Sequence, residues 1–113
     1  MKFSRVVKAI IDERSQGNCE LCGLSAPDGQ YHHRRPRGMG GTKRSETGSP
    51  VNALYLHQAC HLDVEMHREE SLYNGWLVRQ SQDPALTPVN YRGRYSALTN
   101  DGRVILVMPE SSP

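Results

Sequence analysis

The sequence predicts a small α+β domain whose fold is held together by a bound metal ion. Three observations support this prediction: helical spacing of apolar residues near the N-terminus, short β-prone segments separated by turns, and Cys and His residues in closely spaced pairs. The chain has 113 residues, which fits a single domain spanning 1–113, and only 36% of them are hydrophobic. A core this small is typical of domains that need a disulfide or a metal as added support.

Helices are expected at the start and in the middle of the chain. Apolar residues recur at helical spacing between Val6 and Ile11, so a helix is predicted over residues 4–15, with Gly17 ending it. Residues 59–67 lack Gly and Pro and contain good helix formers, which predicts a second helix. A short third helix is predicted over residues 69–73, stopping near Gly75.

Strands are expected on either side of these helices. Residues 30–34 and 53–57 are predicted as short strands, and the Gly-, Pro-, Ser- and Thr-rich stretch 36–50 between them as a loop. Proline at 84 and 88 indicates an irregular crossing after the third helix. Residues 95–99 and 104–108 flank Asn100-Asp101-Gly102, which predicts a β-hairpin.

Two residue pairs with two-residue gaps predict a zinc site. Cys19 and Cys22 have the C-x2-C spacing that lets one turn present two thiolates to one ion, and His57 and Cys60 repeat the gap as H-x2-C. Four nitrogen and sulfur ligands are the set that tetrahedral Zn²⁺ prefers in structural sites. The alternatives are a redox pair at Cys19 and Cys22, buried cysteines without a metal, and His61 in place of His57 as the fourth ligand.

Adjacent histidines mark a second candidate site. His32 and His33 fall on the first predicted strand, where neighbouring side chains point to opposite faces, so the backbone must bend if both are to act together. One imidazole can ligate a metal while the other stays free as a base near neutral pH. Asn52 precedes the second strand, and His61 lies in the first turn of the next helix.

These segments resemble the HNH endonuclease family of ββα-metal nucleases. Residues 32–41 (HHRRPRGMGG) are similar to the first half of the HNH signature, and residues 52–61 (NALYLHQACH) are similar to the second half. The resemblance covers about residues 15–68, which would form the nuclease core, with 69–113 as a C-terminal extension. Together with the zinc pairs, this ordered set of motifs is highly specific.

The resemblance implies a role for each residue of the motif. His33 would be the general base, and His32 and His61 would ligate one catalytic divalent ion, Mg²⁺ or else Mn²⁺ or Ni²⁺. Asn52 would hold the loop and orient His33 by a hydrogen bond. The ion would act as a Lewis acid on the scissile phosphate. The implied function is divalent-metal-dependent hydrolysis of DNA.

The chain departs from the family pattern at two positions. Many relatives have Asp where His32 stands, and an imidazole there favours softer ions over Mg²⁺. Colicin-like relatives carry another metal-binding His one turn after the last one, where this chain has Glu65, an additional candidate ligand at i+4 from His61. His67 and Asp63 are interpreted as solvated residues without a catalytic role.

Basic residues beside the candidate base predict a DNA-contacting surface. The net charge is only +2, but a short stretch contains five cations and no acid: Arg34, Arg35, Arg37, Lys43 and Arg44. The C-terminal segment resembles the tails of small HNH proteins of phages and prophages, some encoded beside DNA-packaging genes, which makes terminase proteins candidate partners. With no apolar run long enough for a membrane and no signal peptide, a cytoplasmic location is expected, the bacterial host's if the protein is phage-encoded.

Two other functions compete with a DNA endonuclease. A non-catalytic zinc module that binds DNA needs the zinc ligands and the basic stretch, but not the combination of His33, Asn52 and His61. An RNA nuclease is the third possibility, because ββα sites accept varied substrates. The joint presence of the three residues favours the enzyme.

Overall fold

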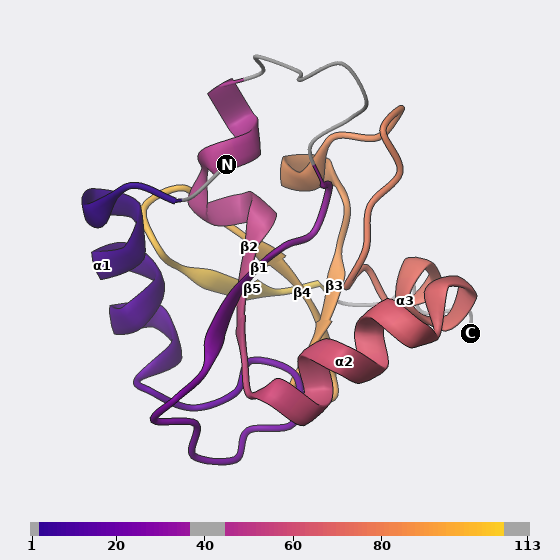
Figure 1. The fold of residues 1–113 in the computed structure, drawn as a ribbon. Helices are drawn as coiled ribbons and strands as arrows, with labels where there is room; N and C mark the ends of the chain where they lie inside the picture. Colours follow the sequence, from indigo (N-terminus) through magenta and orange to yellow (C-terminus); the bar gives the residue numbers. More distant parts are fainter. Residues whose placement is uncertain (1–2, 37–44, 108–113) are drawn as a thin grey trace.

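The first helix, α1 (Arg5–Ser15), begins where the sequence predicts it. The Ser4 side chain caps it by accepting a hydrogen bond from the backbone N–H of Val7 at 3.2 Å. The residue that closes the helix is Gln16, with a left-handed φ of 57°, and not the predicted Gly17, which follows it. The computed structural model describes residues 3–36 and 45–107, and Figure 1 shows α1 along one side of this molecule.

Two short strands and a helix form the centre of the molecule. Strand β1 (Gln30–His33) pairs antiparallel with β2 (Ala53–Leu56), so that His32 lies opposite Leu54. All four residues of β2 are buried, and the chain enters the strand through a 3₁₀ turn at Pro50–Asn52. Helix α2 (Gln58–Met66) follows directly and contacts both strands, and α3 (Arg68–Tyr73) continues from it (Figure 1). The predicted strands and helices are therefore confirmed, with ends that differ by a residue or so.

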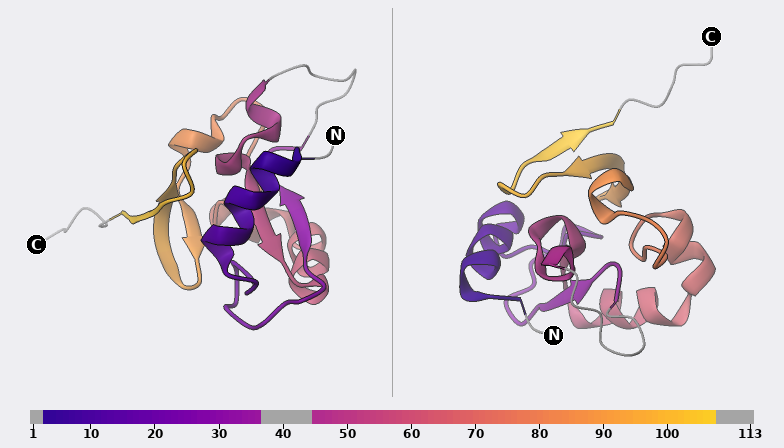
Figure 2. Two further views of the ribbon diagram at one scale, coloured as in Figure 1. Left: turned by 90° about the vertical axis from the view of Figure 1, so that its left-hand side faces the viewer. Right: turned by 90° about the horizontal axis from the view of Figure 1, so that it is seen from above.

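The C-terminal segment forms a second antiparallel sheet in the order β3 (Val89–Tyr91), β4 (Arg94–Leu98), β5 (Val104–Leu106). The β4–β5 pair confirms the predicted hairpin. Strand β3 is an addition to the prediction. It joins β4 through Arg92 and Gly93, both with positive φ, which is the pattern of a type I′ turn. Both views in Figure 2 place this sheet on the opposite side of the molecule from the β1–β2 pair and α2.

A buried polar network connects the two sheets with α1. The Glu20 carboxylate accepts hydrogen bonds from Arg14 at 2.6 and 2.7 Å, from the Tyr91 hydroxyl at 2.6 Å and from the Tyr55 backbone N–H at 2.8 Å. The Arg14 and Glu20 side chains are 1% and 0% exposed, so the charges are paired inside the protein and the carboxylate is fully hydrogen-bonded. The network fixes the turn that carries Cys19 and Cys22. Within residues 3–36 and 45–107, no helix is both long and apolar enough to cross a lipid bilayer.

Candidate functional site

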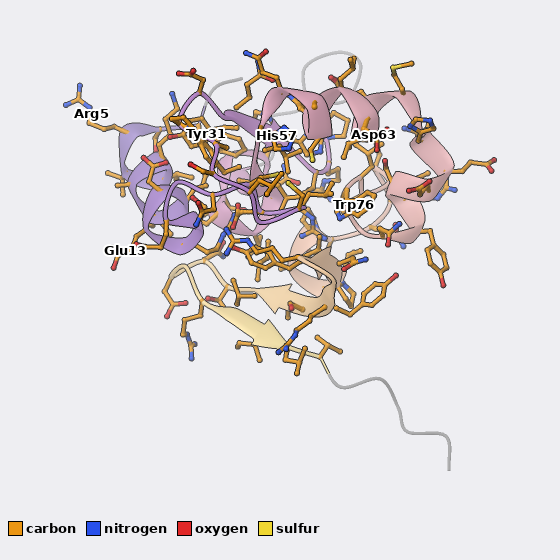
Figure 3. The ribbon with its side chains drawn as sticks, turned by 90° about the horizontal axis from the view of Figure 1, so that it is seen from below. Arg5, Glu13, Tyr31, His57, Asp63 and Trp76 are labelled. Carbon is orange, nitrogen blue, oxygen red and sulfur yellow. The ribbon has the colours of Figure 1, made fainter. Side chains whose placement is uncertain are left out.

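Four sulfur and nitrogen side chains lie together where the sequence predicts a metal site. The ligand atoms of Cys19, Cys22, His57 and Cys60, here called the Cys/His group, all lie within 4.8 Å of one another. The first two residues come from the turn after α1, while His57 caps α2 and Cys60 lies in its first turn (Figure 3 labels His57). His57 Nε2 faces the thiols, 3.3 Å from Cys60 Sγ. This group could hold one zinc ion.

The protonation chemistry of the Cys/His group also suits a cation. Burial acts to raise the pKa of Cys19, but backbone hydrogen bonds at Cys22, His57 and Leu21 outweigh it, so this pKa lies below its ordinary value. Burial, followed by the charge of Cys19, raises the pKa of Cys60 to about 12. One thiolate is thus stabilised, and a second beside it needs a positive ion to neutralise the pair. A zinc ion would supply that charge.

A cleft of about 390 Å³ opens beside β1 and α2. Its polar lining comes from these two elements and from the start of α3, and consists of Tyr31, His32, His33, His61, Glu65 and Arg68. The structure therefore brings together the three histidines to which the family resemblance assigns catalytic roles. We call this place the histidine cleft.

His32 is fixed by the segment that follows α3. Its Nε2 lies 2.8 Å from the backbone carbonyl oxygen of Trp76, so Nε2 carries the proton and Nδ1 does not. Burial lowers the pKa of His32 to about 4, which keeps the imidazole neutral. A neutral imidazole whose outer N–H donates to a carbonyl is the usual arrangement of a metal-ligating histidine.

His61 has a similar arrangement on the facing element, α2. Its Nδ1 lies 2.6 Å from Gln30 Oε1, and its Nε2 lies 3.7 Å from a carboxylate oxygen of Glu65. The rings of His32 and His61 meet edge to face with centroids 5.1 Å apart. Two imidazoles and a carboxylate therefore converge. Within the described residues, they do not form a set of three ligand atoms as close to one another as those of the Cys/His group.

His33 differs from both of these histidines. Within the part of the chain that the structure describes, its imidazole makes no hydrogen bond, and its Nε2 is buried without a partner. The ring of Phe3, which precedes α1, stacks on it with centroids 4.0 Å apart and an interplanar angle of 14°. Burial lowers the pKa of His33, which favours the unprotonated form that a general base requires.

Asn52 holds the backbone beside the cleft but does not bond to His33. Its Oδ1 accepts from the Arg35 backbone N–H at 2.7 Å, and its Nδ2 donates to the carbonyls of Arg35 and Thr47 at 3.0 and 2.9 Å. Asn52 is fully buried, and its amide accepts one hydrogen bond and donates two. The expected role in holding the loop therefore fits, whereas the expected hydrogen bond to His33 is wrong, since the His33 imidazole has no hydrogen-bond partner within the described residues.

Arg34 does not contact solvent, so its predicted role as a DNA contact is wrong. The side chain is fully buried, and the guanidinium donates at 2.7 to 3.1 Å to four backbone carbonyls, those of Val51, Gly75, Pro84 and Thr87. Burial lowers the pKa of Arg34 to about 9, which still leaves it charged near neutral pH. The guanidinium stabilises a convergence of loops, because it supplies donors to backbone carbonyls from four separate positions of the chain.

The remaining predicted DNA contacts are placed only in part. Arg35 is also buried and donates to the Gln82 carbonyl at 2.6 Å, so it is not a free surface cation either. Arg37, Lys43 and Arg44 lie outside the described residues. Sequence reasoning missed Arg68, which lines the cleft; its position after His61, on the next helix, was the available signal.

The two residues interpreted as solvated are exposed in the structure. Asp63 and His67 form an i,i+4 pair on the outside of α2, with 3.0 Å between His67 Nδ1 and Asp63 Oδ1. Figure 3 shows Asp63 on this helix. Neither residue lines the histidine cleft. No protein-family model matches the chain, and no curated protein matches it, so the functional assignment depends on the geometry of the two sites.

Proposed function

We propose that this protein is a divalent-metal-dependent DNA endonuclease of the HNH type. The observation that carries the proposal is the convergence of His32, His33 and His61 in one cleft, on two antiparallel strands followed by a helix. The family resemblance of residues 32–41 and 52–61 supports the same function. The closed Cys/His group beside the open cleft is consistent with one structural and one catalytic metal.

His32 and His61 are the proposed ligands of the catalytic ion. Each has one ring nitrogen bonded to an oxygen of the protein, which leaves Nδ1 of His32 and Nε2 of His61 for a metal. Glu65 is the candidate for a third ligand, because its carboxylate already approaches His61. Two imidazoles favour Mn²⁺ or Ni²⁺ over Mg²⁺. When bound, the ion would polarise the scissile phosphate and stabilise the leaving oxygen.

His33 is the proposed general base. It lines the cleft and takes no hydrogen bond from the described residues, so no protein group competes for the proton that it would accept from the attacking water. Its lowered pKa favours the unprotonated form. Stacking against Phe3 fixes the plane of the ring. Asn52 contributes indirectly, because its side chain holds the backbone of Arg35, just after β1. His33 is thus positioned by the ring of Phe3 and by the backbone of β1, and not by a hydrogen bond to its imidazole from a described residue.

A zinc-containing DNA-binding module without catalysis is the second candidate. It is favoured by one observation: among the described residues, the histidine cleft offers two imidazoles and an exposed carboxylate, not a compact set of three ligands. Both candidates include the zinc ion in the Cys/His group and both bind DNA. They differ in whether a phosphodiester bond is broken.

Cleavage of supercoiled plasmid, with Mg²⁺, Mn²⁺, Ni²⁺ or Zn²⁺ added separately, tests the proposal. We expect nicking or linearisation with at least one ion, and His33→Ala should lower the rate about 10²–10⁴-fold, the usual contribution of a general base. The matched control is His67→Ala, an exposed histidine outside the cleft, which should cut at the wild-type rate. Plasmid that stays intact with every ion, or wild-type rates in His33→Ala, would refute the enzyme and leave the binding module. An RNA substrate in parallel identifies the nucleic acid.

A further inference from the structure

Arg68 is the one arginine or lysine among the cleft-lining residues that the structure describes, and the sequence motifs do not include it. It is the first residue of α3, just after α2 ends. The residue is exposed, and within residues 3–36 and 45–107 its side chain takes part in no hydrogen bond or ion pair. A guanidinium with no protein partner at the edge of a cleft can bind an anionic ligand.

The acid that lines the cleft together with Arg68 does not pair with it. Glu65 precedes it by three residues, a spacing that favours an ion pair within one continuous helix. Here His67, with φ −119° and ψ 69°, separates α2 from α3, so the helical path is interrupted between the two residues. The Glu65 carboxylate instead lies 3.7 Å from His61 Nε2. Acid and base therefore contribute separately to the same cleft.

The two arginines that follow His33 within the described residues, Arg34 and Arg35, do not take this role. Arg34 and Arg35 are both buried and donate to backbone carbonyls, although the sequence predicts them as phosphate contacts. A phosphodiester entering the histidine cleft would bring a negative charge, and among the described lining residues Arg68 is the one that carries a guanidinium or an ammonium group. Arg68 is placed to balance that charge.

We propose that Arg68 binds the non-bridging oxygens of the phosphodiester in the histidine cleft. This inference rests on the proposed endonuclease function and adds to it the residue that holds the reacting group. The planar guanidinium presents two parallel N–H donors that match two phosphate oxygens, which the ammonium of a lysine cannot do. Arg68 would hold the phosphate against the histidines and stabilise the charge that grows on it as the bond breaks.

Arg5 offers a matched control. It is the first residue of α1, as Arg68 is of α3, and it is exposed but does not line the cleft. Figure 3 shows Arg5 pointing away from the body of the molecule. Arg68→Ala and Arg5→Ala thus remove the same charge from the same helical position. Arg68→Lys keeps the charge and removes the planar fork.

Two measurements test the proposal. The first is the salt dependence of binding to a short fluorescein-labelled DNA duplex, measured by anisotropy in a His33→Ala background so that the duplex stays intact. Arg68→Ala should reduce the slope of log K against log[salt] by about 0.9, the value for one lost phosphate contact, and Arg5→Ala should leave it unchanged. The second is duplex cleavage with His33 present, where Arg68→Ala should lower kcat/KM about 10²-fold. Arg68→Lys should keep the slope and recover part of the rate.

The outcomes separate this inference from the function on which it rests. If the wild type binds the duplex but fails to cut it with any of the added ions, the endonuclease proposal fails. The slopes of log K against log[salt] would still show whether Arg68 contacts a phosphate. An unchanged slope in Arg68→Ala, or an equal change in Arg5→Ala, would overturn the assignment. So would Arg68→Lys behaving like Arg68→Ala in both measurements, because the loss would then come from packing and not from charge. Circular dichroism of each variant confirms that it is folded.

Discussion

The Cys/His group and the histidine cleft share one helix but differ in how their side chains are used. Cys60 and His61 are neighbours in the first turn of α2, and each belongs to a different site. The four ligand atoms of the Cys/His group lie within 4.8 Å of one another, and their partners are mainly each other. In the cleft, His32 and His61 each bond outward to an oxygen of the protein, and the other ring nitrogen of each makes no hydrogen bond within the described residues.

This difference matches the one between structural and catalytic metal sites. A structural zinc site fills all four positions with protein atoms, whereas a catalytic site keeps positions open for water and substrate. Orientation must then come from outside the site, through hydrogen bonds to the far side of each ligand. The proposed catalytic ion should accordingly be bound more weakly than a zinc ion in the Cys/His group, and the two should respond differently to the same treatment.

The largest expected effect is the loss of the fold in Cys19→Ser. Structural zinc contributes roughly 10–16 kcal/mol in small zinc-dependent peptides, which is as large as the whole folding free energy of a typical domain, about 5–15 kcal/mol. Circular dichroism melting and elemental analysis should show a protein without zinc and without a cooperative transition. Asp28→Ala, at an exposed position near His57, serves as the control and should melt like the wild type. A zinc-free protein that still melts cooperatively would show that the Cys/His group has no structural metal.

Brief treatment with EDTA should separate the two sites in a single sample. The open coordination shell of the catalytic ion makes it exchange readily, so cleavage should stop while the melting temperature stays the same. Added Mg²⁺ or Mn²⁺ should restore cleavage. Parallel melting curves and plasmid assays provide the measurement. Simultaneous loss of fold and activity, without recovery by Mn²⁺, would contradict the distinction between the two sites.

The smallest expected effect comes from the outer partner of His61. Gln30→Ala removes the oxygen 2.6 Å from His61 Nδ1 and leaves His61 itself in place. Loss of such a partner typically weakens metal binding about 10–100-fold, so the Mn²⁺ concentration needed for half-maximal cleavage should rise by that factor. Zinc content and melting should not change. Gln58→Ala, an exposed glutamine at the start of α2, is the control; an equal shift there would rule out a specific contribution of Gln30.

The elements that local pattern determines could be predicted from the sequence. The strands predicted over 30–34 and 53–57 are found as β1 and β2, and the Asn100-Asp101-Gly102 turn joins β4 and β5. The Cys/His group could also be predicted, because ligand spacing reflects the geometry of a turn. Strand β3 could not, since Pro88 precedes it and the Arg92-Gly93 turn lacks the residue pairs that usually indicate a hairpin.

The errors concern interactions between segments far apart in the chain. An arginine beside a candidate base is usually solvated, and only the meeting of carbonyls from positions 51, 75, 84 and 87 makes Arg34 an interior residue. The stacking of Phe3 on His33 spans 30 positions and follows no periodicity. Arg68 lines the cleft because the chain bends at His67, a change of direction that helical propensity does not reveal.

The carbonyls that accept from Arg34 also determine whether the HNH-like segment can fold without the C-terminal part of the chain. A fragment ending at residue 68 would retain every candidate ligand and the candidate base, but it would lose three of the four carbonyls that accept from Arg34. It would also lose the Trp76 carbonyl that sets the tautomer of His32. Leaving a buried charge without its partners costs about 3–5 kcal/mol, a large share of the stability of a small domain. Grafting the motif into another scaffold would therefore require the segment through Thr87 as well, since that segment completes the interior on which β1 rests.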